Sequence, residues 1–173
     1  IIEAAAEDGI DTILTCDNGI AAISQIARAK ELGMTVVVTD HHDILTEAGE
    51  TPEGREILPP ADAVVNPKRR DSLYPFPDIC GGMVAYKLVQ VLYEVHKVPR
   101  EEWLSLLEIA AIATVGDVMK LQGENRILVK EGLSRLGHTS NLGLRKLIEK
   151  NNLQAGTITA YHIGFVIGPC LNA

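Results

Sequence analysis

Short apolar runs alternate with a helical pattern over the first 65 residues. The runs IDTILT, MTVVVT and ADAVV (residues 10–15, 34–39 and 61–65) have the length of strands, whereas apolar residues between positions 20 and 27 repeat at helical spacing. Strands that are apolar throughout, rather than alternating, are typical of a parallel sheet covered on both faces. The pattern therefore predicts a βαβ unit.

Helical patterns dominate the rest of the chain. A first helix is predicted to end at Gly9, and further helices are predicted over residues 79–95, 104–113, 124–136, 141–150 and 157–167. Residues 44–61, rich in Pro, Gly and Glu, are predicted to form an exposed loop, and the prolines in residues 67–78 predict an irregular segment. The predicted fold is α/β, doubly wound around a largely parallel sheet and followed by a helical segment.

The composition narrows the class of protein. A hydrophobic fraction of 46% and a charged fraction of 23% are typical of a folded globular protein. No apolar run approaches the roughly 20 residues of a membrane-spanning helix, and no signal peptide is visible. The three cysteines form no CxxC pair, which favours reduced thiols in the cytoplasm over a zinc ribbon or disulfide framework. The net charge of −7 excludes a surface that is basic all over, but not a local basic groove.

Titratable residues follow both strong strands. Asp17 comes directly after ILTC, and Asp40-His41-His42 comes directly after VVVT. Ligands of open parallel sheets bind at the carboxyl ends of the strands, so neighbouring strands would place Asp17 and His41 side by side. A third acid, Asp117, follows the apolar helix in TVGDVMKL.

Such a group of carboxylates and imidazoles predicts a site for a divalent metal. Oxygen ligands alone suit Mg²⁺, and histidine nitrogen shifts the preference toward Mn²⁺ or another transition metal. Two such ions about 3.5–4 Å apart can activate water and hold a phosphoryl group for displacement.

Several segments occur in an informative order. They are CDNGI (16–20), VTDHHDI (38–44), VNPKR (65–69), ICGGMVAYKL (79–88), IATVGDVMKLQGENR (112–126) and FVIGPCLNA (165–173). Their order and spacing resemble the motifs of DHH-superfamily phosphoesterases, and in particular of RecJ-type single-strand-specific 5′→3′ DNA exonucleases. The resemblance implies metal-dependent hydrolysis of single-stranded DNA from the 5′ end, with release of 5′-mononucleotides, in DNA repair and recombination.

The resemblance also implies roles for individual residues. Asp17 corresponds to a catalytic carboxylate shared by two Mn²⁺ or Mg²⁺ ions, and His41 and Asp117 correspond to further metal ligands. His42 corresponds to the catalytic histidine that faces the scissile phosphate. Asp40 is expected to orient an imidazole without binding metal itself, as metal-bound histidines usually require.

Two further features are candidates for binding substrate phosphate. Gly81-Gly82 opens a predicted helix, whose free backbone N–H groups can bind an anion, although close helix packing would also explain small residues there. Lys68, Arg69 and Arg70 form a compact basic run that either contacts the DNA backbone or belongs to a solvated loop.

The extent of the resemblance suggests a piece of a larger protein. Residues 1–120 resemble part of a catalytic domain, and residues 121–173 a helical segment leading toward a further domain. The family's Asp-rich first motif would precede Ile1, so we expect an incomplete metal site and little activity from these residues alone. The expected partners are single-stranded DNA, a single-stranded-DNA-binding protein and a helicase, without a membrane.

Two alternatives remain open from the sequence. One is a DHH phosphodiesterase that degrades short oligonucleotides or cyclic dinucleotides, and the other is a non-catalytic homologue that serves as a replication scaffold. The ICGG and GDVMKLQGENR segments favour the RecJ type over the first. Retention of Asp17, His41, His42 and Asp117 argues against the second.

Overall fold

The computed structural model describes residues 1–49 and 54–171. The chain divides into two compact units, Ile1–Pro77 and Asp78–Ala173. The last two residues of the FVIGPCLNA segment lie outside the described part.

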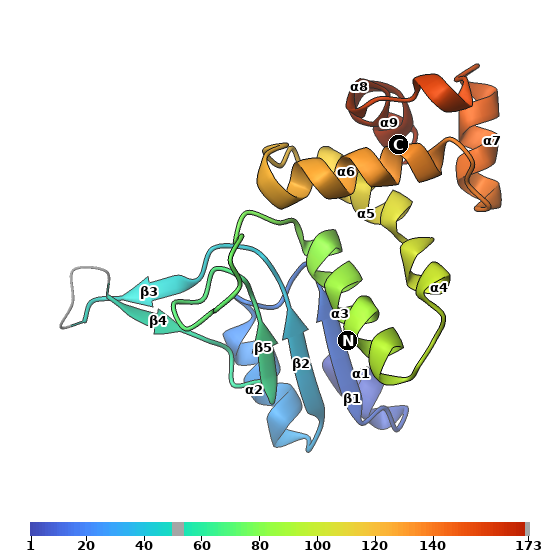
Figure 1. Cartoon of the computed structure of the whole chain (residues 1–173). Coiled ribbons are helices and arrows are strands. Elements are labelled where there is room, and N and C mark those ends of the chain that lie inside the picture. Colours follow the sequence, from blue (N-terminus) through green and yellow to red (C-terminus); the bar gives the residue numbers. More distant parts are fainter. Residues whose placement is uncertain (50–53, 172–173) are drawn as a thin grey trace. The chain divides into compact units, whose positions relative to one another are not determined.

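The first unit is an α/β fold (Figure 1). Its elements are α1 (Ile2–Glu7), β1 (Thr12–Cys16), α2 (Ile23–Glu31), β2 (Thr35–Thr39), β3 (Leu45–Glu47), β4 (Arg55–Ile57) and β5 (Ala63–Val65). A parallel sheet has the order β1-β2-β5, and β3 and β4 form a separate antiparallel pair. The α/β class and the predicted parallel βαβ unit are therefore confirmed.

The central strand β2 explains the apolar run in the sequence. Val36 and Val38 are buried and pack with Met34 and with Ile26 and Ala29 of α2. Burying such side chains stabilises the unit by about 1.5–3 kcal/mol each. The flanking strand β1 is different, because its Leu14 is 56% exposed, so the predicted covering of both faces does not extend to this strand.

The exposed loop predicted over residues 44–61 contains regular structure, and this part of the prediction is wrong. β3 and β4 pair Leu45 with Ile57 and Glu47 with Arg55, and the last two side chains form an ion pair. Each strand has three residues, too few for a period-2 pattern to be visible. Residues 50–53, which belong to the same prediction, lie outside the described residues.

The second unit is helical throughout its described part. Its elements are α3 (Gly81–Val95), α4 (Arg100–Leu104), α5 (Leu107–Gly116), α6 (Gly123–Leu136), α7 (Leu142–Lys150), η1 (Ala155–Thr157), α8 (Ala160–His162), η2 (Ile163–Ile167) and α9 (Gly168–Leu171). The first four predicted helices of this region are confirmed with shifted ends. The fifth, predicted over residues 157–167, is confirmed from Ala160 onward, but it is not a uniform α-helix, because α8 passes directly into the π-helical segment η2.

Glycine lets two helices of this unit approach closely. A Cβ atom on Gly132 of α6 would lie 2.4 Å from the Cβ of Ala111 and 2.7 Å from the carbonyl oxygen of Leu107, both in α5. Beyond this contact, Leu136, Ile163 and Ile167 are fully buried in the core that α6 shares with the C-terminal segments. The helical unit therefore has a core of its own.

The boundary between the compact units follows Pro77. The catalytic domain predicted for residues 1–120 is defined by family motifs rather than by compactness, and its end stays a prediction. In the described part of the chain, no helix combines the length and the hydropathy needed to cross a lipid bilayer.

Candidate metal centre

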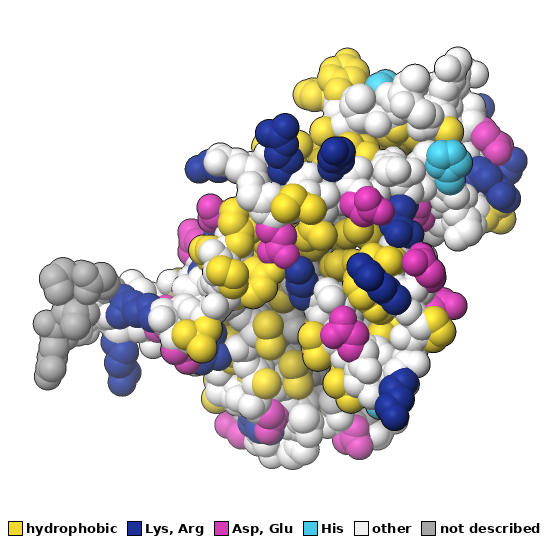
Figure 2. Space-filling model, viewed as in Figure 1, with side chains coloured by type: hydrophobic (Ala, Val, Ile, Leu, Met, Phe, Trp, Pro, Cys, Tyr) yellow, Lys and Arg dark blue, Asp and Glu magenta, His cyan; other side chains and the backbone are white. Residues whose placement is uncertain are grey.

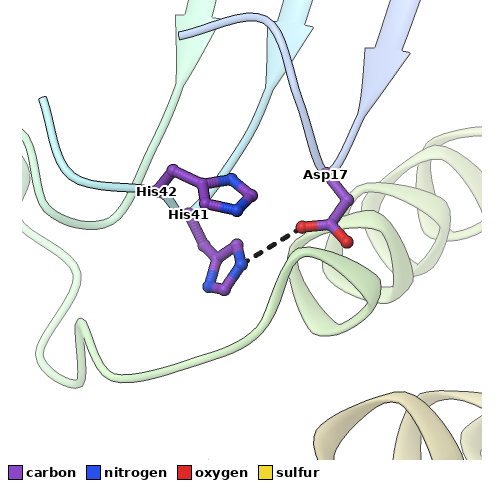
Figure 3. A group of neighbouring side chains, drawn as sticks. All are labelled: Asp17, His41 and His42. Atoms are coloured by element: carbon purple, nitrogen blue, oxygen red, sulfur yellow. Dashed lines mark ion pairs between the residues drawn. The ribbon is translucent and has the colours of Figure 1, made fainter. Parts of the chain in front are cut away.

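The carboxyl ends of β1 and β2 bring together two of the three residues predicted as metal ligands, Asp17 and His41. The register pairs Cys16 with Thr39, so the residues that follow these two strands emerge at the same edge of the sheet. Asp17 Oδ1 lies 3.1 Å from Nε2 of His41. One ligand atom from each of Asp17, His41 and His42 lies within 4.8 Å of the others (Figure 3). The predicted juxtaposition of Asp17 and His41 is observed.

The backbone at Asp17 takes a left-handed conformation, with φ of 60°. This conformation costs a residue with a Cβ about 1 kcal/mol, and aspartate and asparagine tolerate it better than most. The amide of Asp17 donates to the carbonyl of Thr39 (3.0 Å), which continues the β1–β2 ladder into the site. The strained residue is thus held by the sheet, an arrangement that clusters at functional sites.

Asp40 is buried, at 1% exposure, and its carboxylate organises the other residues of this edge. Oδ1 accepts the backbone N–H groups of His41 (2.7 Å) and His42 (3.1 Å), and Oδ2 accepts that of Ile20 (2.9 Å). Oδ1 also lies 2.7 Å from Nδ1 of His42. Asp40 is therefore placed to orient the imidazole of His42, and its role beside a metal-bound histidine stays a prediction.

The hydrogen bonds to Asp40 also decide its charge. Burial raises the pKa of this carboxyl, but the N–H of Ile20 and the ring and backbone of His42 outweigh it and leave the pKa below the ordinary value. The ionised carboxylate makes Nδ1 of His42 the hydrogen donor. Nε2 is then the ring nitrogen of His42 that can interact with a ligand.

The two histidines differ in exposure. The side chain of His41 is 9% exposed, whereas that of His42 is 60% exposed, and their ring centroids lie 4.6 Å apart. Asp17, at 52% side-chain exposure, is also open to solvent. His41 is thus fixed beside the carboxylate, and His42 is the ring that a large substrate can reach.

The VNPKR segment supports this edge through Asn66, which the sequence reasoning missed. Asn66 is 4% exposed; its Nδ2 donates to the carbonyl of His42 (3.0 Å) and its Oδ1 accepts the N–H of Lys68 (2.9 Å). Lys68 Nζ in turn donates to Asp43 (2.8 Å), a hydrogen bond that lowers the pKa of Asp43. The segment therefore holds the backbone carbonyl of His42 and the side chain of Asp43.

The basic run at residues 68–70 has contacts within the first unit. Arg69 donates to the carbonyl of Val64 (2.6 Å) and pairs with Asp71 (2.5 Å), and Arg70 donates to the carbonyl of Gly54 (2.6 Å). These contacts favour a structural role for Arg69 and Arg70, and contact of Lys68 and Arg69 with substrate stays a prediction.

Asp117 lies in the second unit, where it caps the carboxyl end of α5. Val118 follows with a left-handed φ of 55°, and Met119 donates its N–H to the carbonyl of Thr114 (3.1 Å), so the chain turns sharply at this acid. Its role as a metal ligand stays a prediction.

Gly82, the second residue of the glycine pair at the start of α3, has a packing role. A Cβ atom on Gly82 would lie 2.6 Å from the Cβ of Ala113 in α5, so a larger residue would force the helices apart. The side chain of Cys80, the N-cap residue, makes no capping hydrogen bond. Its Sγ is buried 3.5 Å from Oγ1 of Thr114. Helix packing thus accounts for Gly82, and phosphate binding by Gly81 and Gly82 stays a prediction.

Asn125 joins the two motifs of the second unit and was also missed. It is fully buried in α6, and its Nδ2 donates to the carbonyls of Asp78 (2.7 Å) and Lys120 (3.1 Å). Asp78 precedes the glycine pair, and Lys120 follows Asp117. The position of Asn125 in the GENR segment, next to the apolar pattern of α6, is the sequence feature that could have indicated this role.

The donors at the edge of the sheet fit a divalent metal ion. One carboxylate oxygen and two imidazole nitrogens can approach a common centre, and this mixed set suits Mn²⁺ and other transition ions as well as Mg²⁺ with water. Two of the three side chains are exposed, which leaves room for water and substrate in the coordination shell. The side chains present therefore match the predicted type of site.

Comparison with known proteins identifies the class to which this fold and site belong. Residues 2–114 match the pattern of the DHH family, N-terminal domain. The chain therefore belongs to the DHH family. Among individual proteins, it is 41% identical over 167 residues to the single-stranded-DNA-specific exonuclease RecJ of Bacillus subtilis, a match that covers 96% of this chain and 19% of that protein.

Solved structures give the same result. A crystal structure of exonuclease RecJ bound to manganese matches with a TM-score of 0.78 at 31% identity, over 99% of this chain and 41% of that one. RecJ from Thermus thermophilus in complex with Mn²⁺ matches with a TM-score of 0.75 at 32% identity, over 99% of this chain and 24% of that one. The predicted RecJ-type resemblance is confirmed, and the chain spans less than half the length of these relatives.

Proposed function

We propose that the protein carrying this chain is a metal-dependent exonuclease that hydrolyses single-stranded DNA from the 5′ end and releases 5′-mononucleotides. The observation that carries the proposal is the cluster of Asp17, His41 and His42 at the carboxyl edge of the sheet, with His41 3.1 Å from Asp17. The relatives named as single-stranded-DNA-specific exonucleases support the substrate class.

Asp17 and His41 are the proposed metal ligands of the first unit, and Asp117 is the proposed ligand from the second. A divalent ion held there would lower the pKa of bound water and offset the charge of a phosphodiester. The left-handed backbone at Asp17 and the near-complete burial of His41 support fixed positions for both side chains. Preorganised ligands avoid reorganisation when the reaction proceeds.

His42 is the proposed contact for the scissile phosphate. Asp40 holds Nδ1, so Nε2 can donate to a phosphate oxygen when the ring is protonated or accept a proton when it is neutral. The exposure of His42 supports this division of roles with His41. The N-terminal N–H groups of α3 at Gly81 and Gly82, together with Lys68 and Arg69, are proposed secondary contacts for substrate phosphate.

These 173 residues by themselves are proposed to have little activity. Asp17, His41 and Asp117 give only three protein ligands for two metal ions, so the ions would be held weakly even with water completing their coordination. No specific observation favours either alternative, the DHH phosphodiesterase for short oligonucleotides or cyclic dinucleotides or the non-catalytic scaffold. The intact site residues and the exonuclease relatives both count against a scaffold.

Aspartates at the two ends of one strand provide the test. Asp17 follows β1 and Asp11 precedes it. In the full-length protein, Asp17→Ala should reduce Mn²⁺-dependent release of mononucleotides from single-stranded DNA by at least about 10³-fold, because a metal ligand is lost. Asp11→Ala should cleave at the wild-type rate. Cleavage by the Asp17→Ala protein at more than a tenth of the wild-type rate would refute the proposed site.

A further inference from the structure

A hollow of about 760 Å³ opens on the second unit between α3, α4 and α6. Four cations line it, namely Lys87, Arg100, Arg126 and Lys130, against one carboxylate, that of Glu131. We call this hollow the α6 groove. A concave surface with such an excess of positive charge attracts anions more strongly than a flat surface of equal charge.

Partners within the protein balance some of these charges but not all. Lys87 pairs with Glu124 (2.5 Å), and Glu131 accepts from Arg135 (3.2 Å). Across residues 1–49 and 54–171, Arg126 and Lys130 take part in no ion pair. Arg100 also takes part in no ion pair among these residues, but its guanidinium lies over the ring of Trp103. Within the described part of the chain, Arg126 and Lys130 are therefore the two groove cations held neither by an ion pair nor by an aromatic ring.

Arg126 and Lys130 lie one turn apart on one face of α6, and Ser134 continues the row one turn further. The same three residues also line a second hollow, of about 460 Å³, that reaches His138. The row is about 12 Å long, at 1.5 Å per helical residue. Figure 2 shows Lys and Arg side chains gathered over α6. A straight row bordered by two hollows fits an extended anion better than a compact one.

The second unit, which carries the α6 groove, is also more positively charged than the first. The second unit has ten Lys and Arg against nine Asp and Glu, whereas the first has six against fourteen. The excess of cations in the groove is thus a local feature of a chain whose net charge is −7.

The aromatic residues of the groove have a supporting role. Tyr86 and Trp103 are only 5% and 8% exposed, and their rings pack edge to face with centroids 6.1 Å apart. The guanidinium carbon of Arg100 lies 5.7 Å from the centroid of the Trp103 ring, within the range of a cation–π contact. Buried rings cannot stack on bases, so a ligand would be held by charge and not by base identity.

We propose that the α6 groove binds the sugar–phosphate backbone of single-stranded DNA, with Arg126 and Lys130 on phosphates and Ser134 as a hydrogen-bonding neighbour. The choice of single-stranded DNA rests on the proposed function, whereas the preference for an extended polyanion rests on the groove alone. Such binding is independent of sequence and weakens with salt, because each phosphate contact releases counterions.

The test compares two double variants of the full-length protein. Arg126→Ala/Lys130→Ala removes the two unpaired cations that lie on α6. Arg145→Ala/Lys150→Ala removes the same charge from α7, where both residues are exposed. Binding of fluorescein-labelled oligothymidylate is followed by fluorescence anisotropy against KCl concentration, in EDTA so that metal-dependent cleavage is prevented.

Loss of two phosphate contacts should make the plot of log K against log salt shallower by about 1.4, at about 0.7 per contact. The change should be the same for oligodeoxyadenylate, and the α7 variant should keep the wild-type slope. Ser134→Asp, which adds a carboxylate to the row, should also weaken binding. An unchanged slope in Arg126→Ala/Lys130→Ala would overturn the proposal, and weaker binding of a Glu-rich peptide alongside it would assign the groove to an acidic protein partner.

The failure of this inference can be told from the failure of the proposed function. The slope is measured without metal and does not depend on Asp17. If the slope is unchanged in Arg126→Ala/Lys130→Ala but cleavage is lost in Asp17→Ala, the proposed metal site is supported and the proposed DNA-binding groove is refuted. If the slope is shallower in Arg126→Ala/Lys130→Ala but cleavage is retained in Asp17→Ala, the groove is supported and the proposed metal site is refuted.

Discussion

The two ends of the parallel sheet use aspartate in opposite ways. At the amino end, Asp62 accepts two hydrogen bonds from Lys30 Nζ (2.8 and 2.6 Å) and one from the N–H of Val36 (2.7 Å). At the carboxyl end, Asp17 faces a histidine and Asp40 is bonded to backbone and imidazole, and neither forms an ion pair with Lys or Arg within the described residues.

The difference teaches how structural and functional acids can be separated. A carboxylate whose charge is balanced by a local cation has little left to offer a metal ion. A carboxylate beside an imidazole and without lysine or arginine, as at Asp17, keeps its charge for an external cation. Position along the strand alone does not make this distinction, since both ends carry Asp residues.

The largest expected effect on stability follows from removing Asp40. Asp40→Ala leaves the N–H groups of Ile20, His41 and His42 without their acceptor and releases the ring of His42. We expect a loss of about 2–4 kcal/mol in unfolding free energy, because buried donors left unsatisfied cost about 1–3 kcal/mol each. Cleavage should also fall by at least about 10²-fold.

Urea unfolding and amide hydrogen exchange at Ile20 and His41 measure the effect on stability. Asp8→Ala, which removes an exposed carboxylate at the end of α1, is the matched control and should change neither quantity. Wild-type exchange at both amides in Asp40→Ala would contradict the organising role of Asp40.

A smaller effect should separate the two histidines. His41→Ala should weaken Mn²⁺ binding, measured by calorimetry, by about 10–100-fold, because a ligand beside Asp17 is lost. His42→Ala should lower kcat by about 10²-fold or more while Mn²⁺ binding changes less, because its ring is exposed and held by Asp40. Equal losses of metal affinity and of kcat in the two variants would contradict the proposal that His41 and His42 have different roles.

The smallest effect is expected at the amino end of the sheet, in Asp62→Asn. The hydrogen bond from Lys30, and then that from the N–H of Val36, lower the pKa of Asp62 in the folded protein. The resulting stabilisation is fully present above the unfolded pKa, whose ordinary value is 3.8, and is lost as pH falls through the lower folded value. Asp62→Asn should therefore be modestly less stable than wild type at pH 7 and nearly equal in strong acid.

Urea unfolding midpoints across this pH range measure the difference. DNA cleavage at pH 7 serves as the internal control and should equal that of the wild type, because Asp62 lies at the opposite end of the sheet from the site. A stability difference that does not change with pH would show that the ion pair with Lys30 is not its source.

The sequence was sufficient to predict the carboxyl edge of the sheet. Apolar runs of strand length around an amphipathic helix specify a parallel βαβ unit, and parallel pairing places Asp17 beside His41. That inference needs only local patterns and one topological rule. The family motifs suggested the roles of individual residues, which no periodicity contains and which stay proposals.

Other features depend on contacts between distant residues. The β3–β4 pair has strands too short to show a pattern, and the partner of Asp43 is Lys68, 25 residues away. Asn66 and Asn125 act through buried hydrogen bonds to backbone carbonyls. Because asparagine is common in exposed loops and turns, the sequence alone does not reveal this buried role. The π-helical turn at Ile163–Ile167 follows an apolar pattern that equally suits an α-helix.

The left-handed backbone at Asp17 limits which amino acids this position can accept. Glutamate keeps the charge, but its longer side chain is disfavoured at φ of 60° and would displace the carboxylate from His41. Asparagine and glycine keep the backbone conformation but lose the charge. The substitutions that the backbone tolerates best are thus those that would remove the charge needed by the proposed metal site, and inactive relatives with an intact fold should arise by single substitutions here.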